Sequence, residues 1–262
     1  MMALMSMLVD TSICIGCKGC EVACKQWNEL PAEIKGFSGV SYDNTLALSD
    51  KTWCHVGFVE QGQTPSADFR WLFVSDRCKH CAQAGCLEVC PTGAIYRTET
   101  GAVNINPAVC NGCQNCVSAC PFGVVSLNHD TGVANKCTLC SDRTEIMGRE
   151  PACVTACPTD ALVWGDRDEM IALAEQKQTR LHSNGVRASL YGKDELGGLN
   201  VMFVLQDEPG VYGLPSNPQL PQRNVPAGYV FTAAGAVLLG LAAAVTFRNR
   251  PSQPETVEVK EG

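Results

Sequence analysis

Residues 110–121 read CNGCQNCVSACP, in which four cysteines follow one another with the spacing C-x2-C-x2-C-x3-C. The same spacing recurs at residues 14–24, and two looser versions of it occupy residues 78–90 and 137–157. Three thiolates held this close in a tight loop suit three metal ions at adjacent corners of one cluster. The fourth cysteine, three residues further on, lies one helical turn away from that loop. The four motifs are distributed over residues 14–157, so metal binding is expected to determine the fold of this part of the chain.

The spacing is that of bacterial ferredoxins that hold two [4Fe–4S] clusters. In such pairs the fourth cysteine of one motif ligates the cluster of the other motif, and the exchange is reciprocal. Only 19 residues, 91–109, separate the second motif from the third, so these two are expected to pair within one compact unit. The first and fourth motifs then pair around it. This nesting predicts four [4Fe–4S] clusters.

The nested pairing divides sixteen cysteines into four ligand groups. Group 1 is Cys14, Cys17, Cys20 and Cys157; group 2 is Cys24, Cys137, Cys140 and Cys153; group 3 is Cys78, Cys81, Cys86 and Cys120; group 4 is Cys90, Cys110, Cys113 and Cys116. Structural zinc is the alternative for the fourth motif taken alone, because two separated cysteine pairs form a tetrahedral site. Beside three triplet motifs, iron–sulfur chemistry is favoured. Cys54 belongs to no motif and is interpreted as a small buried apolar residue.

The composition excludes several other classes of protein. The chain has 262 residues and 17 cysteines, and this odd number is incompatible with a fully paired disulfide framework. A net charge of −7 argues against nucleic acid as a partner. The sequence has no P-loop or dinucleotide fingerprint, and its four histidines are scattered. The chain is therefore expected to relay electrons without a catalytic site of its own.

The expected fold is α+β and loop-rich, with two nested bacterial-ferredoxin-like dicluster units. The pattern of apolar and turn-forming residues predicts two hairpins, two further strands and one helix. The hairpins are 55–60 with 70–75 and 94–97 with 103–105; the further strands are 7–9 and 200–205; the helix is 168–181. The predicted organisation is an outer unit of residues 1–76 and 130–180, an inner unit of 77–129, an extended Gly/Pro-rich arm over 181–226, a transmembrane helix over 227–247 and a polar tail over 248–262.

The C-terminal apolar segment is long enough to cross a membrane. Gly228 to Phe247 contains no charged side chain over twenty residues, which as a helix spans about 30 Å, the thickness of bilayer hydrocarbon. A buried core helix is the alternative, but a Pro-rich segment before it and a polar tail after it favour a membrane anchor. Arg248 and Arg250 follow the span, while Arg223 alone precedes it. The positive-inside rule then predicts a cytoplasmic C-terminus and a cluster domain on the periplasmic or other extracytoplasmic side.

Four stretches carry a resemblance to a known family: CIGCKGCEVACKQWNE at 14–29, KCTLCSDR at 136–143, EPACVTACPTDAL at 150–162 and GLPSNP at 213–218. Together with the motif order and the terminal apolar helix, they resemble the beta (iron–sulfur) subunit of membrane-bound respiratory formate dehydrogenases. The resemblance covers about residues 8–247. The cysteine frame alone is also shared by the corresponding subunits of molybdopterin oxidoreductases acting on nitrate, sulfoxides, tetrathionate or polysulfide.

The resemblance implies a non-catalytic subunit that works between two partners. In that family a large catalytic subunit with a molybdenum or tungsten bis-pterin oxidises formate, and the beta subunit receives the electrons. A gamma subunit, a membrane cytochrome b, then takes them to the quinone and packs against the beta anchor helix. The sequence departs from the motif pattern at one point, because Cys24 is followed by Lys25 where the other three motifs have proline.

Overall fold

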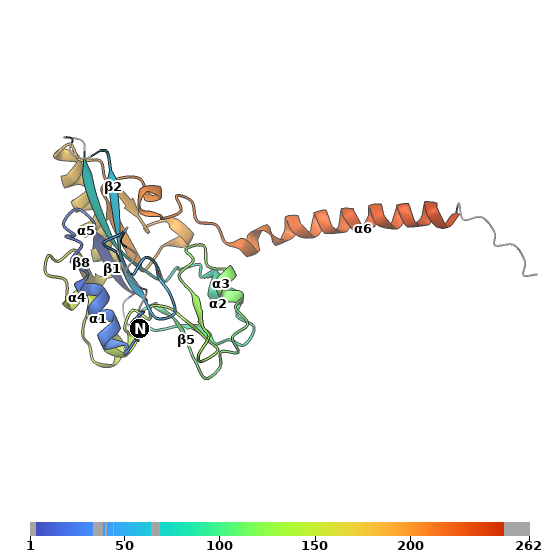
Figure 1. The fold of residues 1–262 in the computed structure, drawn as a ribbon, viewed down its shortest axis with the longest axis horizontal. Helices are drawn as coiled ribbons and strands as arrows, with labels where there is room; N and C mark the ends of the chain where they lie inside the picture. The colour runs from blue at the N-terminus through green and yellow to red at the C-terminus, as the bar shows by residue number, and fades with distance from the viewer. Residues whose placement is uncertain are drawn as a thin grey trace, which may run out of the picture. The chain divides into compact units, whose positions relative to one another are not determined.

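A computed structural model of the chain describes residues 4–33, 39, 41–43, 45–63, 66 and 69–248. Its contacts divide the chain into two units, Met1–Pro221 and Gln222–Gly262. The first unit holds every cysteine, and the second holds one long helix (Figure 1).

A four-stranded sheet forms the centre of the first unit. Its strands, in the order β8-β1-β10-β9, are β8 (Leu162–Asp166), β1 (Met5–Asp10), β10 (Val201–Leu205) and β9 (Ser189–Tyr191). Strand β1 runs parallel to β10 and antiparallel to β8. All five residues of β10 are buried, which matches an uninterrupted apolar run covered on both faces. The predicted strands at 7–9 and 200–205 are confirmed.

Three two-stranded hairpins surround this sheet. They are β2 (Cys54–Gln61) with β3 (Arg70–Arg77), β4 (Ile95–Arg97) with β5 (Val103–Ile105), and β6 (Ser126–Asn128) with β7 (Val133–Asn135). The first two hairpins confirm the sequence prediction. The third was not predicted, because each of its strands, SLN and VAN, ends in asparagine, a residue that is depleted in strands.

In each cysteine motif, a helix begins before the last cysteine. The four helices are α1 (Gly19–Trp27), α2 (Gly85–Glu88), α3 (Asn115–Ser118) and α4 (Ala152–Thr155). Helix α1 packs against α4, and α2 packs against α3 (Figure 1). The remaining elements of this unit are α5 (Arg167–Ser183), which confirms the predicted helix, and the short turns η1 (Asp142–Ile146), η2 (Glu195–Gly197) and η3 (Pro209–Tyr212).

The segment expected to form an extended arm instead contributes to the core. Strands β9 and β10 both lie within residues 181–226, and Phe203 is 0% exposed. One of the two neighbours of β10 in the sheet is β1, almost two hundred residues earlier in the chain. Such long-range pairing leaves no local trace in the glycine and proline content that suggested an arm. Beyond β10 the chain continues in short turns, with Tyr212, Leu214 and Leu220 buried.

The second unit contains the short turn η4 (Pro221–Asn224), which starts at its edge, and helix α6 (Val225–Arg248). Over Tyr229–Arg248 the mean hydropathy of this helix is 2.1, and the helix is long and apolar enough to cross a membrane. The predicted polar tail begins at Arg248, the last residue of α6, and its residues 249–262 lie outside the described part of the chain.

Candidate metal centres

The four cysteines of group 1 line one cavity, although they come from opposite ends of the cluster-binding region. The empty space at this site, including the part open to solvent, is about 360 Å³, and its other walls include the apolar side chains of Val9, Val56 and Leu162. Burial, together with repulsion from the other three sulfurs of the group, raises the pKa of Cys14. Repulsion of this kind requires that the sulfurs lie near one another. The structure thus brings Cys157, directly after α4, to the loop before α1.

Group 2 surrounds a second cavity of about 310 Å³. All four of its cysteines are buried, and Met7, Trp53 and Leu139 complete much of the wall. Burial and then repulsion from the other members of the group raise the pKa of Cys24. Cys24 comes from α1 and Cys153 from α4, so the packing of these two helices assembles both group 1 and group 2.

Groups 3 and 4 are assembled in the same manner by α2 and α3. Burial and repulsion from the other three sulfurs of group 3 raise the pKa of Cys81. Burial and repulsion from the other sulfurs of group 4 raise the pKa of Cys116 to about 11. Each sulfur that repels these two thiols belongs to the group predicted from spacing. In both cases the fourth cysteine of one motif lies beside the first three of the other.

The groups are neighbours in a single order. Cys153 of group 2 and Cys20 of group 1 interact electrostatically, and Cys78 of group 3 packs with Cys137 of group 2 in one buried cluster. Groups 3 and 4 share the apolar cluster around Ile95, Val103 and Ala134. In space the order is therefore group 1, group 2, group 3, group 4.

The two ends of this order reach the surface. Cys17 in group 1 and Cys113 in group 4 are exposed, whereas all of group 2 is buried. Near Cys17, Ile15 is 58% exposed and Val22 is 63% exposed. An apolar rim therefore borders the group 1 end.

One backbone feature is common to all four motifs. The residue before the second cysteine has a positive φ in each: Gly16 (66°), His80 (48°), Gly112 (70°) and Leu139 (51°). Glycine adopts this conformation without steric cost, whereas His80 and Leu139 adopt it at a steric cost. The four motif loops thus share one backbone turn directly before their second cysteine. At His80 the ring also helps, because its Nδ1 accepts a hydrogen bond of 2.9 Å from Val103 N–H.

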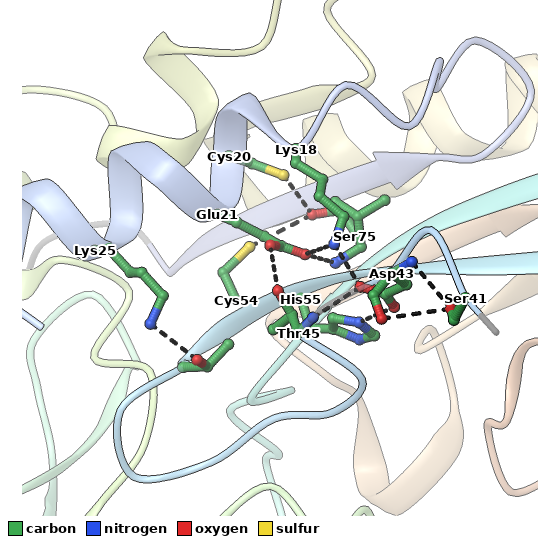
Figure 2. Close-up of polar contacts among 12 residues, drawn as sticks. Lys18, Cys20, Glu21, Lys25, Ser41, Asp43, Thr45, Cys54, His55 and Ser75 are labelled. Carbon is green, nitrogen blue, oxygen red and sulfur yellow. Dashed lines mark hydrogen bonds and ion pairs between the residues drawn. The ribbon is translucent and has the colours of Figure 1, made fainter. Parts of the chain in front are cut away.

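The site nearest the first motif has a polar support that the sequence did not reveal. Lys18, between two ligands, forms a 2.5 Å ion pair with Asp43, as Figure 2 shows. Although burial opposes it, hydrogen bonds from Lys18 and His55 lower the pKa of Asp43 to about 2. Ser75 Oγ lies 3.1 Å from the Cys20 sulfur. No sequence motif marks Asp43 or Ser75, because both come from outside the motifs and meet them only in the folded chain.

The donor sets fit iron–sulfur clusters. The two cavities are lined by thiols and apolar groups. In the described part of the chain, no three His, Cys, Asp or Glu side chains converge on the position of a single ion. Tetrahedral zinc needs all its sulfurs about 2.3 Å from one point, whereas a cubane spreads its irons over separate corners. The buried Nε of Arg77, beside the group 2 cavity, lacks a hydrogen-bond partner among the described residues and suits a cluster sulfide.

Comparison with known proteins agrees with this chemistry. Two family models described as "4Fe-4S dicluster domain" match residues 69–167 and 13–95. The iron–sulfur subunit of the nitrate-inducible formate dehydrogenase of Escherichia coli K12 is 40% identical over 245 residues, covering 88% of this chain and 82% of that protein. The formate dehydrogenase iron–sulfur subunit of Haemophilus influenzae is 41% identical over 81% of this chain and 69% of its own length. The thiosulfate reductase electron transfer subunit of Salmonella typhi is 45% identical over 62% of this chain and 76% of its own length.

Proposed function

Because this chain belongs to the family of formate dehydrogenase iron–sulfur subunits, we propose that it passes electrons from a formate-oxidising catalytic subunit towards a membrane quinone. It acts as an electron-transfer subunit and has no catalytic site of its own. The observation that carries the proposal is the order of the cysteine groups, which run from one exposed end through a buried interior to another exposed end.

We propose four [4Fe–4S] clusters, held by groups 1 to 4 as predicted from spacing. The cavities lined by groups 1 and 2 support this partition, as do the mutual repulsions within groups 3 and 4. The packing of α1 on α4 and of α2 on α3 supports two nested ferredoxin-like units, because each helix pair joins the motifs expected to exchange a cysteine. The outer unit is residues 1–76 and 130–180, to whose sheet β9 and β10 add two strands, and the inner unit is residues 77–129.

The chain's residues set the conditions for electron transfer. A [4Fe–4S] cluster takes up and releases electrons at a potential set by its net charge, hydrogen bonds to sulfur and solvent exposure. The protein fixes the cysteines, excludes water from the buried groups, and leaves group 1 and group 4 near the surface at Cys17 and Cys113. These exposed ends are where partner cofactors approach. The apolar rim at Ile15 and Val22 suits a permanent subunit interface at the group 1 end.

The proposed partners are a large molybdopterin or tungstopterin catalytic subunit and a membrane cytochrome b. Helix α6 supports the membrane part of the proposal, because Tyr229–Arg248 has the length and hydropathy of a single span. We propose that it anchors the chain with its C-terminus in the cytoplasm and the cluster domain on the extracytoplasmic side. Because clusters are inserted in the cytosol, this orientation implies that the chain crosses the membrane after it has folded.

Purification of the native complex from membranes tests the function. We expect a large subunit to copurify, formate to reduce an artificial dye through it, and non-haem iron and acid-labile sulfide to occur in equal amounts. A complex that lacks formate activity but acts on another substrate would identify the alternative, the corresponding subunit of a different molybdopterin oxidoreductase. The similarity to a thiosulfate reductase subunit makes thiosulfate one substrate to assay. Stoichiometric zinc without sulfide would contradict the electron-transfer role altogether.

A further inference from the structure

Arg77 occupies an unusual position between groups 1 and 2. It is the last residue of β3, opposite Cys54 of β2, and its side chain is 0% exposed. Ser75, two residues earlier, projects from the same face of the strand and is 2% exposed. This face of the hairpin turns towards the first motif, since the rings of Phe58 and Phe73 on it lie against Gly16. The hairpin thus buries a full guanidinium among the cysteines.

The guanidinium contacts sulfur and hydroxyl groups. Its Nη1 donates to the Cys153 sulfur at 2.8 Å and to the Met7 sulfur at 3.2 Å. Its Nη2 donates to Ser75 Oγ and, at 3.4 Å, to the Ser75 carbonyl. Among the residues that the structure describes, no carboxylate lies within ion-pair distance of Arg77. Its partners Met7, Ser75 and protonated cysteine carry no charge.

Such a charge needs compensation. A buried ion without a counter-charge is costly, and arginine does not escape the cost by losing its proton. Lys79, two residues along the chain and 1% exposed, shows the ordinary solution, because it pairs with the Asp76 carboxylate. For Arg77 the available anions are the iron-bound thiolates: Cys153 of group 2 directly, and Cys20 of group 1 through Ser75.

Ser75 completes the connection to group 1. Its hydroxyl lies 3.1 Å from the Cys20 sulfur and 3.6 Å from the Cys54 sulfur, as Figure 2 shows for these three residues. An unbroken series of polar contacts therefore runs from Cys20 through Ser75 and Arg77 to Cys153. It joins a ligand of one proposed cluster to a ligand of the next.

We propose that Arg77 is the shared counter-charge of the clusters held by groups 1 and 2, and that with Ser75 it forms a hydrogen-bonded bridge between them. This inference rests on the four-cluster relay proposed above. Reduction adds negative charge to a cluster, so a fixed cation and hydrogen bonds to its sulfurs favour the reduced form. Arg77 and Ser75 are thus positioning residues that keep both centres reducible at higher potentials than their burial alone would allow.

An EPR-monitored redox titration of the purified complex tests this. Arg77→Met keeps much of the side-chain length but removes the charge and the fork of donors. We expect full iron content and, for the group 1 and group 2 centres, at least a tenfold fall in the equilibrium constant for reduction, which is about 59 mV for a one-electron couple. Ser75→Ala is expected to lower the potential of the group 1 centre alone. Signals missing in Cys14→Ser and Cys140→Ser variants identify the two centres.

The control is Arg167→Met, because Arg167 is half-buried and likewise donates to uncharged oxygens, those of Leu199 and Ser6. It is expected to leave all potentials unchanged. Unchanged potentials in an Arg77→Met complex with full iron would overturn the proposal. If Arg77→Met loses iron, the variant Arg77→Lys decides between charge and shape. Retention of both clusters in Arg77→Lys supports a requirement for the positive charge. Their loss shows that the shape of the side chain is what matters, and it refutes the proposal. Iron, sulfide and formate-dependent dye reduction of the unaltered complex test the proposed function separately.

Discussion

At the scale of single residues, Glu21 fastens the first cysteine motif to the hairpin that covers it. The side chain follows the ligand Cys20 on α1, and the residue is 5% exposed. Its carboxylate accepts a 2.5 Å hydrogen bond from Val56 N–H in β2 and a 3.3 Å bond from the Thr45 hydroxyl (Figure 2). Lys18 lies 3.7 Å away and supplies a positive charge. The contacts of this buried carboxylate with its donors hold β2 in place against α1.

We predict that Glu21→Ala weakens the binding of the cluster proposed for group 1. The substitution leaves the Val56 N–H without its acceptor, which costs about 1–3 kcal/mol, and each kcal/mol lowers the melting temperature by about 2–4 °C in a domain of this size. The measurement is the temperature at which the purified complex loses its visible iron–sulfur absorbance. Glu21→Gln keeps one acceptor oxygen and should lose less. Glu208→Ala removes an exposed carboxylate and should lose its absorbance at the same temperature as the unaltered protein. The same result for Glu21→Ala would show that the Glu21 carboxylate is dispensable.

At the scale of elements, the motif loops depend on close backbone approaches. Gly112, in the third motif, has a φ of 70°, and a Cβ on it would lie 2.4 Å from the carbonyl oxygen of Gly132. Gly132 lies in the turn between β6 and β7, so this hairpin packs directly on the loop that holds group 4. Gly123, after the same motif, has a similar φ of 62° but has no atom within 4 Å of its Cβ position.

This contrast gives a matched pair of variants. Gly112→Ala should separate the loop from the hairpin and displace the group 4 ligands, so that iron falls by about four atoms per chain. Gly123→Ala should cost only the strain of a left-handed residue, about 1 kcal/mol, with full iron content. Iron analysis and counting of reducible EPR centres provide the measurement. Equal iron content in the two variants would show that the contact with Gly132 is not needed.

Helix α6 allows a second prediction at this scale. Leu238 lies near the middle of Tyr229–Arg248, and an arginine at the centre of a membrane span costs about 2.5–3.5 kcal/mol. Leu238→Arg should therefore reduce the share of the chain recovered in washed membranes, while the clusters already bound keep their EPR signals. Leu238→Phe, an apolar exchange, should leave the distribution unchanged. Unaltered membrane recovery of Leu238→Arg would mean that α6 is not needed to hold the chain at the membrane.

The elements also show which features are legible in a sequence. The cysteine spacing is a local feature of the sequence, and so are the residue patterns of the first two hairpins and of helix α5. The strands at 55–60 and 94–97 and the helix at 168–181 were therefore predicted. The pairing of β10 with β1 is not local, and the predicted arm was wrong at β9 and β10 for this reason. Arg77 and Ser75 were missed because their importance comes from what β3 packs against. A lone arginine at a strand end carries no pattern of its own.

At the scale of the whole molecule, the order of the cysteine groups is the one expected of a linear electron relay. Group 2 adjoins group 1 through Arg77 and adjoins group 3 through Cys137 and Cys78. Group 3 adjoins group 4 within one apolar cluster. Electron transfer slows steeply with distance, so each step is expected to use these neighbours. A defect in an interior group should then divide the relay into two parts.

Cys140→Ser, in group 2, tests this division without assuming a direction of flow. Formate added to the purified complex should reduce either the group 1 centre alone or the centres of groups 3 and 4 together, depending on which end faces the catalytic subunit. Dithionite, which reaches all centres from solution, should reduce every remaining one. Cys113→Ser, in group 4 at an exposed end, should leave groups 1 to 3 either all reducible by formate or all silent. Rapid-freeze EPR distinguishes these patterns. If formate reduces the centres of group 1 and of groups 3 and 4 in Cys140→Ser, electrons bypass group 2. The groups then form a branched network and not a linear relay.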